Sequence, residues 1–286
     1  WGYSHGLVRS YALGKPVISI GNITAGGTGK TPFSVYLAKK IILSGKRPAI
    51  LMRGYMSCGG AVSDEEQMVK DQLAGIIVRA SPDRVRSAQE SLEKDRPDIF
   101  ILDDGFQHWK IRRDLEIVLV DAINPFGNGW PLPLGLLREP KSSLTRADIF
   151  VLTRADLAPD RARELGRELG IIRPQAVIAE TAHVPVGTEE PLLGKDFGQS
   201  PDLASVRGRI CACSAIGSPE GFASTLENLG AEIVHHDIFR DHHVYTDDDV
   251  RRLVAVCRSK KVDRLVTTQK DVVKLIAFKE LFCDIR

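Results

Sequence analysis

Cysteine is scarce in this sequence, with five residues among 286. They are too scattered to form a disulfide framework, so the pattern is typical of a protein from a reducing compartment. Cys211 and Cys213 alternate within an apolar run, which places both thiols on one face of a strand. We therefore expect this pair to pack in a core rather than to bind a metal.

Long apolar runs are also missing from the sequence. It contains no stretch of 18 or more apolar residues, which excludes a membrane-spanning helix within these 286 residues. We expect no cleaved signal peptide either. The chain begins with Trp1 rather than Met, so we expect residues to precede it. An N-terminal membrane anchor would lie among those residues.

An excess of charge of one sign is absent as well. The chain has 39 basic and 37 acidic residues, a net charge of +2 that gives no reason to expect a nucleic-acid partner. Basic residues do gather in two stretches, which contain Arg79, Arg84, Arg86, Lys94 and Arg96, and then Lys110, Arg112 and Arg113. Each stretch suits either an anionic substrate or membrane surface, or a solvated helix face.

Short apolar runs alternate with helical patterns along most of the chain. Strands are predicted over 16–20, 48–52, 76–79, 98–102, 115–120, 149–152, 209–216, 231–236 and 265–268. Helices are predicted over 31–43, 83–94, 219–229 and 247–259, with weaker signals within 1–14 and from Asp64. This alternation predicts an α/β fold with a doubly wound, mainly parallel sheet. Pro and Gly interrupt residues 182–207, so we expect two domains, over 1–185 and 186–286.

A glycine-rich loop follows the first predicted strand and ends in Gly29-Lys30-Thr31 at the start of a helix. This order is that of a phosphate-binding P-loop, in which backbone N–H groups and a helix N-terminus meet phosphate oxygens. Lys30 would reach the β- and γ-phosphates, and the Thr31 hydroxyl would ligate Mg²⁺. The strict motif has glycine where this chain has Thr24. The nucleotide-binding residues predicted here are Thr24, Ala25, Gly26, Gly27, Thr28, Gly29, Lys30 and Thr31.

Three further stretches carry polar residues at predicted strand ends or loops. Asp103-Asp104 ends an apolar strand, as the Mg²⁺-binding carboxylate of a P-loop enzyme does, although a turn or cap would also place acids there. Asp64 follows a loop and suits a general base, but acids in a first helical turn are common. Residues 239–246 are dense in titratable groups, and Thr246 is also suited to cap the next helix.

Taken together, these motifs resemble the tetraacyldisaccharide 4'-kinase (lipid A 4'-kinase) family, whose P-loop also tolerates the threonine. The resemblance covers about residues 15–275. It is carried by Gly21-Asn22-Ile23-Thr24 with the rest of the P-loop, Arg53-Gly54-Tyr55, Ser63-Asp64-Glu65, Asp103-Asp104-Gly105-Phe106-Gln107-His108, Phe126-Gly127-Asn128-Gly129, Leu137-Arg138-Glu139-Pro140, Phe239-x-Asp241-His242-x-x-Tyr245 and Thr268-Gln269-Lys270-Asp271. Ser63 and Gln269 depart from the family pattern, which has Gly and Glu there.

The resemblance implies ATP-dependent phosphorylation of a lipid A disaccharide precursor at its 4'-hydroxyl. It implies that Asp64 is the general base, coupled to His242, with Lys30 on the phosphates and the smaller domain closing over the site. Mg²⁺ would be held by Thr31 with Asp103 or Glu139. The substrate-binding candidates are Arg53, Arg84, Arg86, Asn128 and Arg138, and Arg113 is a further candidate for the 1-phosphate. The expected setting is the cytoplasmic face of the bacterial inner membrane, with peripheral contact by a monomer.

One alternative comes from another functional class. Nucleotide-switch ATPases of the partitioning or metallochaperone type share Gly-Gly-x-Gly-Lys-Thr, but they carry a signature lysine where this chain has Ala25. A ligase of the dethiobiotin-synthetase type is a weaker possibility, because it leaves the His242 motif unexplained. Transfer of phosphate to a lipid, or dimer-dependent ATP hydrolysis without it, separates the first two interpretations.

Overall fold

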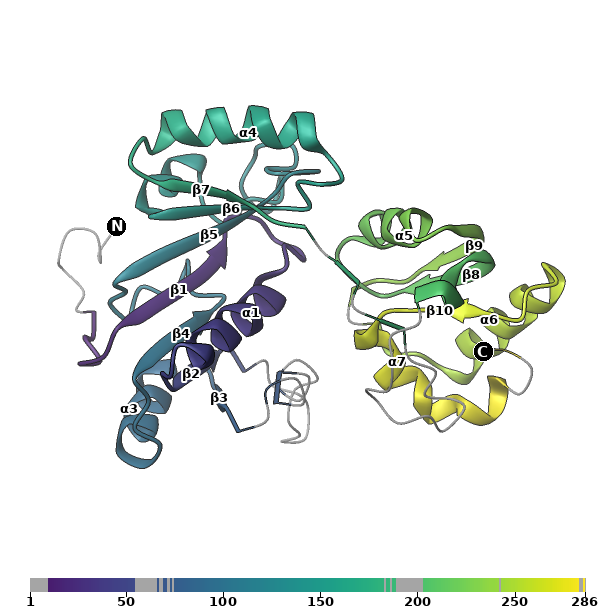
Figure 1. The fold of residues 1–286 in the computed structure, drawn as a ribbon, viewed down its shortest axis with the longest axis horizontal. Helices are drawn as coiled ribbons and strands as arrows, with labels where there is room; N and C mark the ends of the chain where they lie inside the picture. Colours follow the sequence, from purple (N-terminus) through teal and green to yellow (C-terminus); the bar gives the residue numbers. More distant parts are fainter. Residues whose placement is uncertain are drawn as a thin grey trace. The chain divides into compact units, whose positions relative to one another are not determined.

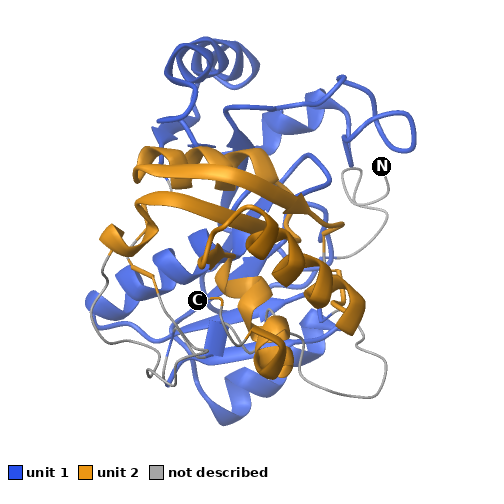
Figure 2. Ribbon diagram, turned by 90° about the vertical axis from the view of Figure 1, so that its right-hand side faces the viewer, with its two compact units in different colours: residues 1–182 blue, residues 183–286 orange. Residues whose placement is uncertain are grey.

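The chain divides into two compact units, residues 1–182 and 183–286 (Figures 1 and 2). The computed structural model describes residues 10–54, 66, 69, 70, 73, 75–182, 184, 185, 187, 188, 203–241, 243–282 and 285. The domain boundary expected from the sequence, after residue 185, lies close to this division. Each unit has its own sheet and its own core, so the two are described separately.

Unit 1 is built on a seven-stranded sheet in the order β3-β2-β4-β1-β5-β6-β7. Its pairings are parallel throughout the described residues. The strands are β1 (Val17–Asn22), β2 (Pro48–Met52), β3 (Ile77–Ala80), β4 (Ile99–Asp103), β5 (Leu115–Asp121), β6 (Ile149–Thr153) and β7 (Val177–Glu180). The central strands are continuous Val/Ile/Leu runs, which suits strands that are buried on both faces. The predicted doubly wound α/β fold is confirmed.

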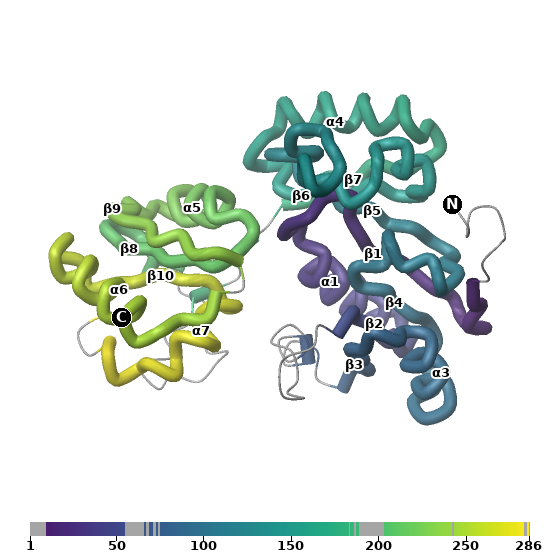
Figure 3. The backbone as a smooth tube through the Cα atoms, turned by 180° about the vertical axis from the view of Figure 1, so that it is seen from behind, coloured from purple at the N-terminus to yellow at the C-terminus, as the bar shows by residue number. Residues whose placement is uncertain are grey.

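Helices cover both faces of this sheet (Figures 1 and 3). On one face, Val35 and Ala38 of α1 (Lys30–Leu43) pack on apolar residues of β1, β2, β4 and β5. The opposite face is covered in two parts. Val85 and Ala88 of α3 (Arg84–Lys94) pack over β2 and β4, and Leu165 of α4 (Pro159–Ile172) packs over β5 and β6. The short helix η1 (Lys141–Arg146) connects β5 to β6.

The strand order reverses around β1, and this reversal predicts where a ligand binds. From β1 the chain builds β2, β3 and β4 on one side and then crosses to β5, β6 and β7 on the other. In open α/β sheets, ligands gather at the carboxyl ends of the strands beside such a switch point. The loop after β1 and the residues after β4 both lie at that place.

Unit 2 has a smaller parallel sheet in the order β10-β8-β9, formed by β8 (Gly208–Ser214), β9 (Ala231–Ile238) and β10 (Leu265–Val266). Leu226 of α5 (Pro219–Asn228) packs with Ile210 on one face. On the other face, Cys211 and Cys213 pack with residues of α6 (Asp247–Ser259), α7 (Gln269–Leu275) and η4 (Ile276–Phe282). Both thiols are buried, as predicted. The remaining short helix is η3 (Leu203–Val206).

Several elements differ from those predicted. Helices α4 and α7, strand β7 and the short helices are additional to the predicted elements, and β10 has two residues where a strand over 265–268 was predicted. Within the weak helical signal over 1–14, the described residues are not helical, because Tyr11 pairs with Ile111 as a parallel bridge. Among the described residues, no helix is long and apolar enough to cross a membrane.

Candidate active site

The loop between β1 and α1 has the geometry of a P-loop. Gly29 lies at the N-cap of α1 with φ of +83°, a left-handed conformation that glycine adopts without steric cost. The helix begins at Lys30, as the motif predicts, and Pro32 lies in its first turn. The loop glycines Gly26 and Gly27 are exposed.

Thr24, which replaces the glycine of the strict motif, has a structural role. It forms an isolated antiparallel bridge with Leu137, an extended conformation that a β-branched residue favours. The amide of the buried Asn22 donates to the Thr24 carbonyl at 2.8 Å and contacts its hydroxyl at 3.3 Å. The start of the loop is therefore held by two contacts, the bridge with Leu137 and the hydrogen bonds from Asn22. Asn22 stood in the quoted motif, but no role was predicted for it.

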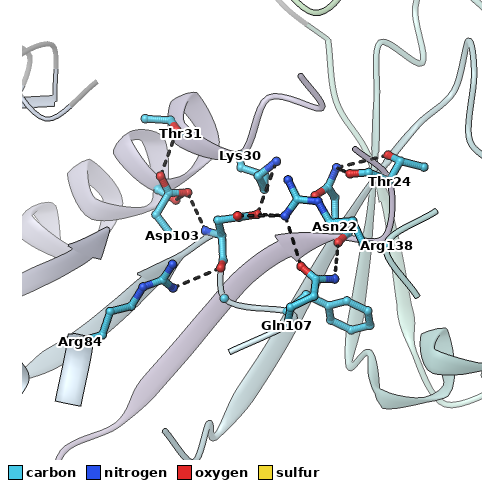
Figure 4. Close-up of polar contacts among 12 residues, drawn as sticks. Asn22, Thr24, Lys30, Thr31, Arg84, Asp103, Gln107 and Arg138 are labelled. Carbon is cyan, nitrogen blue, oxygen red and sulfur yellow. Dashed lines mark hydrogen bonds and ion pairs between the residues drawn. The ribbon is translucent and has the colours of Figure 1, made fainter. Parts of the chain in front are cut away.

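Asp103 joins the end of β4 to the P-loop (Figure 4). Its Oδ2 accepts a hydrogen bond from the Thr31 hydroxyl at 2.9 Å, and its Oδ1 accepts one from the Ser34 hydroxyl at 2.9 Å. Burial raises the pKa of the Asp103 carboxyl, and the two hydroxyl donors oppose that rise. A hydroxyl and a carboxylate in contact offer the hard oxygen ligands that Mg²⁺ prefers.

The neighbouring Asp104 is surrounded by cations. Arg138 donates to its two carboxylate oxygens at 2.8 and 2.9 Å, and the Lys30 ammonium lies 3.6 Å from Oδ1 (Figure 4). Burial alone would raise the pKa of Asp104, but Lys30 and Arg138 more than offset it and hold that pKa below its usual value. Burial lowers the pKa of Lys30, against the opposing effect of Asp104. Asp103 is thus surrounded by hydroxyl donors, whereas the adjacent Asp104 is surrounded by cations.

The turn after Asp104, residues 104–109, is held by two arginines that the sequence analysis did not connect with it. Arg113 Nη2 donates to the carbonyls of Gly105, Phe106 and His108 at 3.0, 3.4 and 3.2 Å. Its Nε lies 2.7 Å from Glu116, which is 3% exposed. The guanidinium of Arg146 stacks on the rings of Phe106 and Trp109. This structure places Arg113 in the support of the turn, whereas the sequence analysis offered it as a ligand of the 1-phosphate.

Gln107 connects this turn to the P-loop strand. Its amide donates to the Asn22 carbonyl at 3.1 Å, and its carbonyl oxygen lies 3.3 Å from Arg138 Nη1 (Figure 4). A side-chain amide that follows an acidic pair is not by itself a signal, so this connection could not be predicted from the residues alone.

The other predicted ligands occupy distinct positions around the site. Arg84 is buried at the start of α3 and donates to the Asp104 carbonyl at 3.1 Å. Arg86 is exposed, pairs with Glu90 one turn further along, and lines a polar hollow of about 450 Å³ at the end of β3. The Glu139 carboxylate accepts from Arg146 at 2.8 and 3.2 Å. Arg53 is exposed just after β2.

Asn128 forms hydrogen bonds within its own loop. Its amide nitrogen donates to the Leu134 carbonyl at 2.8 Å, and its oxygen accepts from the Trp130 backbone at 3.2 Å. The structure therefore shows it bracing residues 128–134, while the sequence analysis proposed that it contacts the substrate.

Asp64 and His242 both lie outside the described residues. Around the second of these, Asp241 accepts from Lys270 at 2.8 Å, and His243 lies 2.9 Å from Asp249. Thr246 caps α6 in a capping box with Asp249, as predicted.

The family model for tetraacyldisaccharide-1-P 4'-kinase matches residues 1–283. The tetraacyldisaccharide 4'-kinase of Syntrophus aciditrophicus is 38% identical over 98% of this chain and 80% of its own length. That of Geobacter sulfurreducens is 37% identical over 96% of this chain and 79% of its own length.

This chain belongs to the tetraacyldisaccharide 4'-kinase family. A crystal structure of LpxK from Aquifex aeolicus in complex with ATP matches 99% of this chain and 92% of its own, with a TM-score of 0.65 and 29% identity. The match spans both units, so the family fold accounts for the whole chain. It confirms the predicted P-loop architecture, and it does not favour the switch-ATPase alternative.

Membership of this kinase family implies that the chain binds ATP. The P-loop contacts the strand-end carboxylate of Asp103 through the hydroxyl of Thr31, next to Lys30. Among the described residues, no group of three or more His, Cys, Asp and Glu side chains is arranged to hold a metal ion. A P-loop Mg²⁺ does not need such a group, because phosphate oxygens and water supply most of its ligands.

Proposed function

We propose that this chain is an ATP-dependent kinase that phosphorylates the 4'-hydroxyl of tetraacyldisaccharide 1-phosphate, giving lipid IVA in lipid A biosynthesis. The observation that carries the proposal is the contact of 2.9 Å between Thr31 of the P-loop and Asp103 at the end of β4. It joins the phosphate-binding loop to a strand-end carboxylate, as a phosphoryl-transfer enzyme requires. The family relationship of the whole chain names the acceptor.

Nucleotide and metal would occupy the carboxyl edge of the sheet. The loop amides of residues 24–29 and the Lys30 ammonium would hold the phosphates of ATP. Thr31 and Asp103 are the residues that would hold Mg²⁺, because Asp104 is paired with Arg138 and Glu139 with Arg146. When bound, Mg²⁺ neutralises charge on the β- and γ-phosphates. Hydrogen bonds from Thr31 and Ser34 keep the Asp103 oxygens oriented toward this place.

The transfer needs a base for the sugar hydroxyl. The 4'-oxygen attacks the γ-phosphorus, the bond to the β-phosphate oxygen breaks, and ADP leaves. We assign the hydroxyl proton to the Asp64 carboxylate, with His242 coupled to it and Lys30 on the transferring phosphate. These three roles rest on the family motifs.

The acceptor carries a 1-phosphate and four acyl chains. Arg53, Arg84, Arg86, Asn128 and Arg138 remain the proposed headgroup ligands. Of these, Arg84 and Arg138 both contact Asp104, which Lys30 of the P-loop also approaches. We further propose that the enzyme acts as a monomer on the cytoplasmic face of the inner membrane. Sedimentation velocity and cell fractionation test these two points.

The deciding experiment is transfer of labelled γ-phosphate from ATP to tetraacyldisaccharide 1-phosphate. Asp64→Ala and His242→Ala should each slow the chemical step by ~10²–10⁴-fold while ATP still binds. Asp247→Ala is the matched control, because Asp247 is an exposed acid in the first turn of α6. If Asp64→Ala keeps full turnover, Asp64 is not the general base. Brisk dimer-dependent ATP hydrolysis without lipid product would support the switch-ATPase alternative.

A further inference from the structure

Unit 1 exposes a cluster of large apolar side chains that its own core does not use. Trp130, Leu132, Leu134 and Leu136 are 62, 55, 75 and 42% exposed. They lie within residues 129–137, where the sequence Gly-Trp-Pro-Leu-Pro-Leu-Gly-Leu-Leu has no charged side chain. We call residues 130–136 the apolar loop. Four large apolar side chains exposed within seven residues indicate an interaction surface, because exposed apolar residues are ordinarily scattered singly.

The apolar loop has a defined backbone. Leu137 and Trp130 close it, with the Leu137 N–H donating to the Trp130 carbonyl at 3.1 Å and the Leu132 N–H donating to the Leu137 carbonyl at 2.8 Å. Asn128 braces it from within. Gly135 permits the closure, since a Cβ there would lie 2.2 Å from the Trp130 carbonyl oxygen. The exposed side chains are thus presented by a hydrogen-bonded frame.

This frame is attached directly to the P-loop. The Ala25 N–H donates to the Leu136 carbonyl at 2.7 Å, and the Arg138 N–H donates to the Ile23 carbonyl at 2.7 Å. Thr24 and Leu137 form the bridge between these two bonds. A surface that docks on the apolar loop therefore lies beside the loop that holds the γ-phosphate.

We infer that the apolar loop docks on a lipid bilayer and so brings the enzyme's nucleotide site to the membrane surface. The inference rests on the proposed function, because an acceptor with four acyl chains stays in a bilayer while its hydroxyl must reach the γ-phosphate. Tryptophan and leucine without charge are the residues that enter the boundary between headgroups and acyl chains, to a depth of ~5–10 Å. A second copy of the chain is the competing occupant.

Trp130 itself can report the contact. With Trp1→Phe and Trp109→Phe it becomes the single tryptophan of the chain. On addition of vesicles of phosphatidylcholine and phosphatidylglycerol, its emission should shift to the blue, and acyl-brominated lipids should quench it. A protein that sediments with the vesicles while Trp130 emission stays unchanged binds through another surface, and the inference is then wrong.

A matched pair of substitutions tests the energetics. Leu134→Glu should lower the fraction bound to vesicles at least tenfold and raise KM for the lipid acceptor in vesicles, with ATP affinity unchanged. Leu43→Glu is the control, because Leu43 is 80% exposed at the end of α1 remote from the P-loop. It should behave as the unsubstituted chain does. Equal partitioning of the two variants would overturn the inference, as would a loss of ATP affinity in Leu134→Glu.

Two further measurements separate the possible failures. Turnover of a deacylated, water-soluble acceptor should be the same in Leu134→Glu and in the unsubstituted chain, because that acceptor needs no bilayer. If Leu134→Glu changes only the oligomeric state in sedimentation velocity, the surface joins two copies and the membrane assignment fails. If the unsubstituted chain binds vesicles through Trp130 but phosphorylates no lipid, the proposed function fails and the docking surface stands.

Discussion

Replacement of Arg113 by Met separates two interpretations of this arginine. The sequence offers Arg113 as a ligand of the substrate's 1-phosphate. The structure places it behind the turn of residues 104–109, where it donates to three backbone carbonyls and pairs with Glu116. Met keeps much of the length and apolar packing of the side chain and removes the charge and the donors. The two interpretations then predict different properties to change.

The magnitude follows from burial of the pair. Arg113 is 16% exposed and Glu116 is 3% exposed. Removal of one partner of a buried ion pair typically costs about 3–5 kcal/mol, because the other charge stays buried without compensation. The lost carbonyl bonds belong to the same network, so their energies are not added separately. Burial already raises the pKa of Glu116, and Arg113 is the first group that opposes the rise. Without Arg113 that pKa rises further.

The stability deficit of the variant should therefore depend on pH. Where the folded-state pKa of Glu116 lies above the unfolded value, the folded chain binds the extra proton as pH falls, which stabilises it. The deficit of Arg113→Met should be largest near neutral pH and should shrink by up to about 1.4 kcal/mol per pH unit between the Glu116 pKa of the variant and the lower Glu116 pKa of the unsubstituted chain. A second change, Glu116→Gln, should recover at least half of the deficit, because replacing both partners by neutral groups is often nearly neutral.

Urea unfolding followed by tryptophan fluorescence measures this directly, since the Arg113 guanidinium lies 5.8 Å from the centre of the Trp109 ring. Kinase assays on the same variant complete the test. A variant within about 1 kcal/mol of the unsubstituted chain at neutral pH, with a raised KM for the lipid, would refute the structural argument. That result would support the other interpretation, in which Arg113 binds the 1-phosphate of the substrate.

Three further predictions concern the same unit. Burial, with Arg84 and Arg113 nearby, lowers the pKa of His108 from 6.5 to about 4. The unfolded chain then binds the proton more readily, so between about pH 8 and pH 5 the unsubstituted chain should lose about 1 kcal/mol more stability than His108→Asn, after allowance for partial exposure. Gly21→Ala should destabilise by about 1–3 kcal/mol, since its Cβ would lie 2.5 Å from that of Phe106, whereas Gly170→Ala within α4 should stabilise by about 0.5–1 kcal/mol in the same urea titrations. Lys30→Ala should abolish both nucleotide binding, measured by calorimetry, and phosphate transfer.

The strand, loop and helix of the P-loop were predictable because their signals are local. A strand, a glycine-rich turn and a helix start follow one another within residues 17–43, and each has its own residue preference. The strand ending in Asp103 was predictable for the same reason. Parallel strands end at one edge of a sheet, so the approach of Asp103 to Thr31 followed from topology.

The different environments of Asp103 and Asp104 could not be predicted, since adjacent acids look alike in a sequence. Their partners come from elements far along the chain, and Asp104, which pairs with Arg138, has a left-handed φ of +52° that nothing in the sequence marks. β7 was missed for another reason. It is an edge strand whose Val177 is 60% exposed, so it lacks the buried apolar run that marks the central strands. α4 did carry a signal, with Pro159 at its start and Ala162, Leu165 and Leu169 on one face.

The segment of residues 136–138 connects the P-loop, the apolar loop and Asp104, which lie apart in the sequence. Its backbone pairs with the P-loop at Ile23 and Ala25, and Leu136 belongs to the apolar loop. Its last side chain, Arg138, binds the Asp104 carboxylate, which the Lys30 ammonium also approaches. The apolar loop is thus joined to the P-loop by two short backbone hydrogen bonds, and to Asp104 by the ion pair of Arg138. If the loop rests on a bilayer, the position of the membrane surface is fixed relative to the γ-phosphate, and a lipid hydroxyl needs little diffusion to reach it.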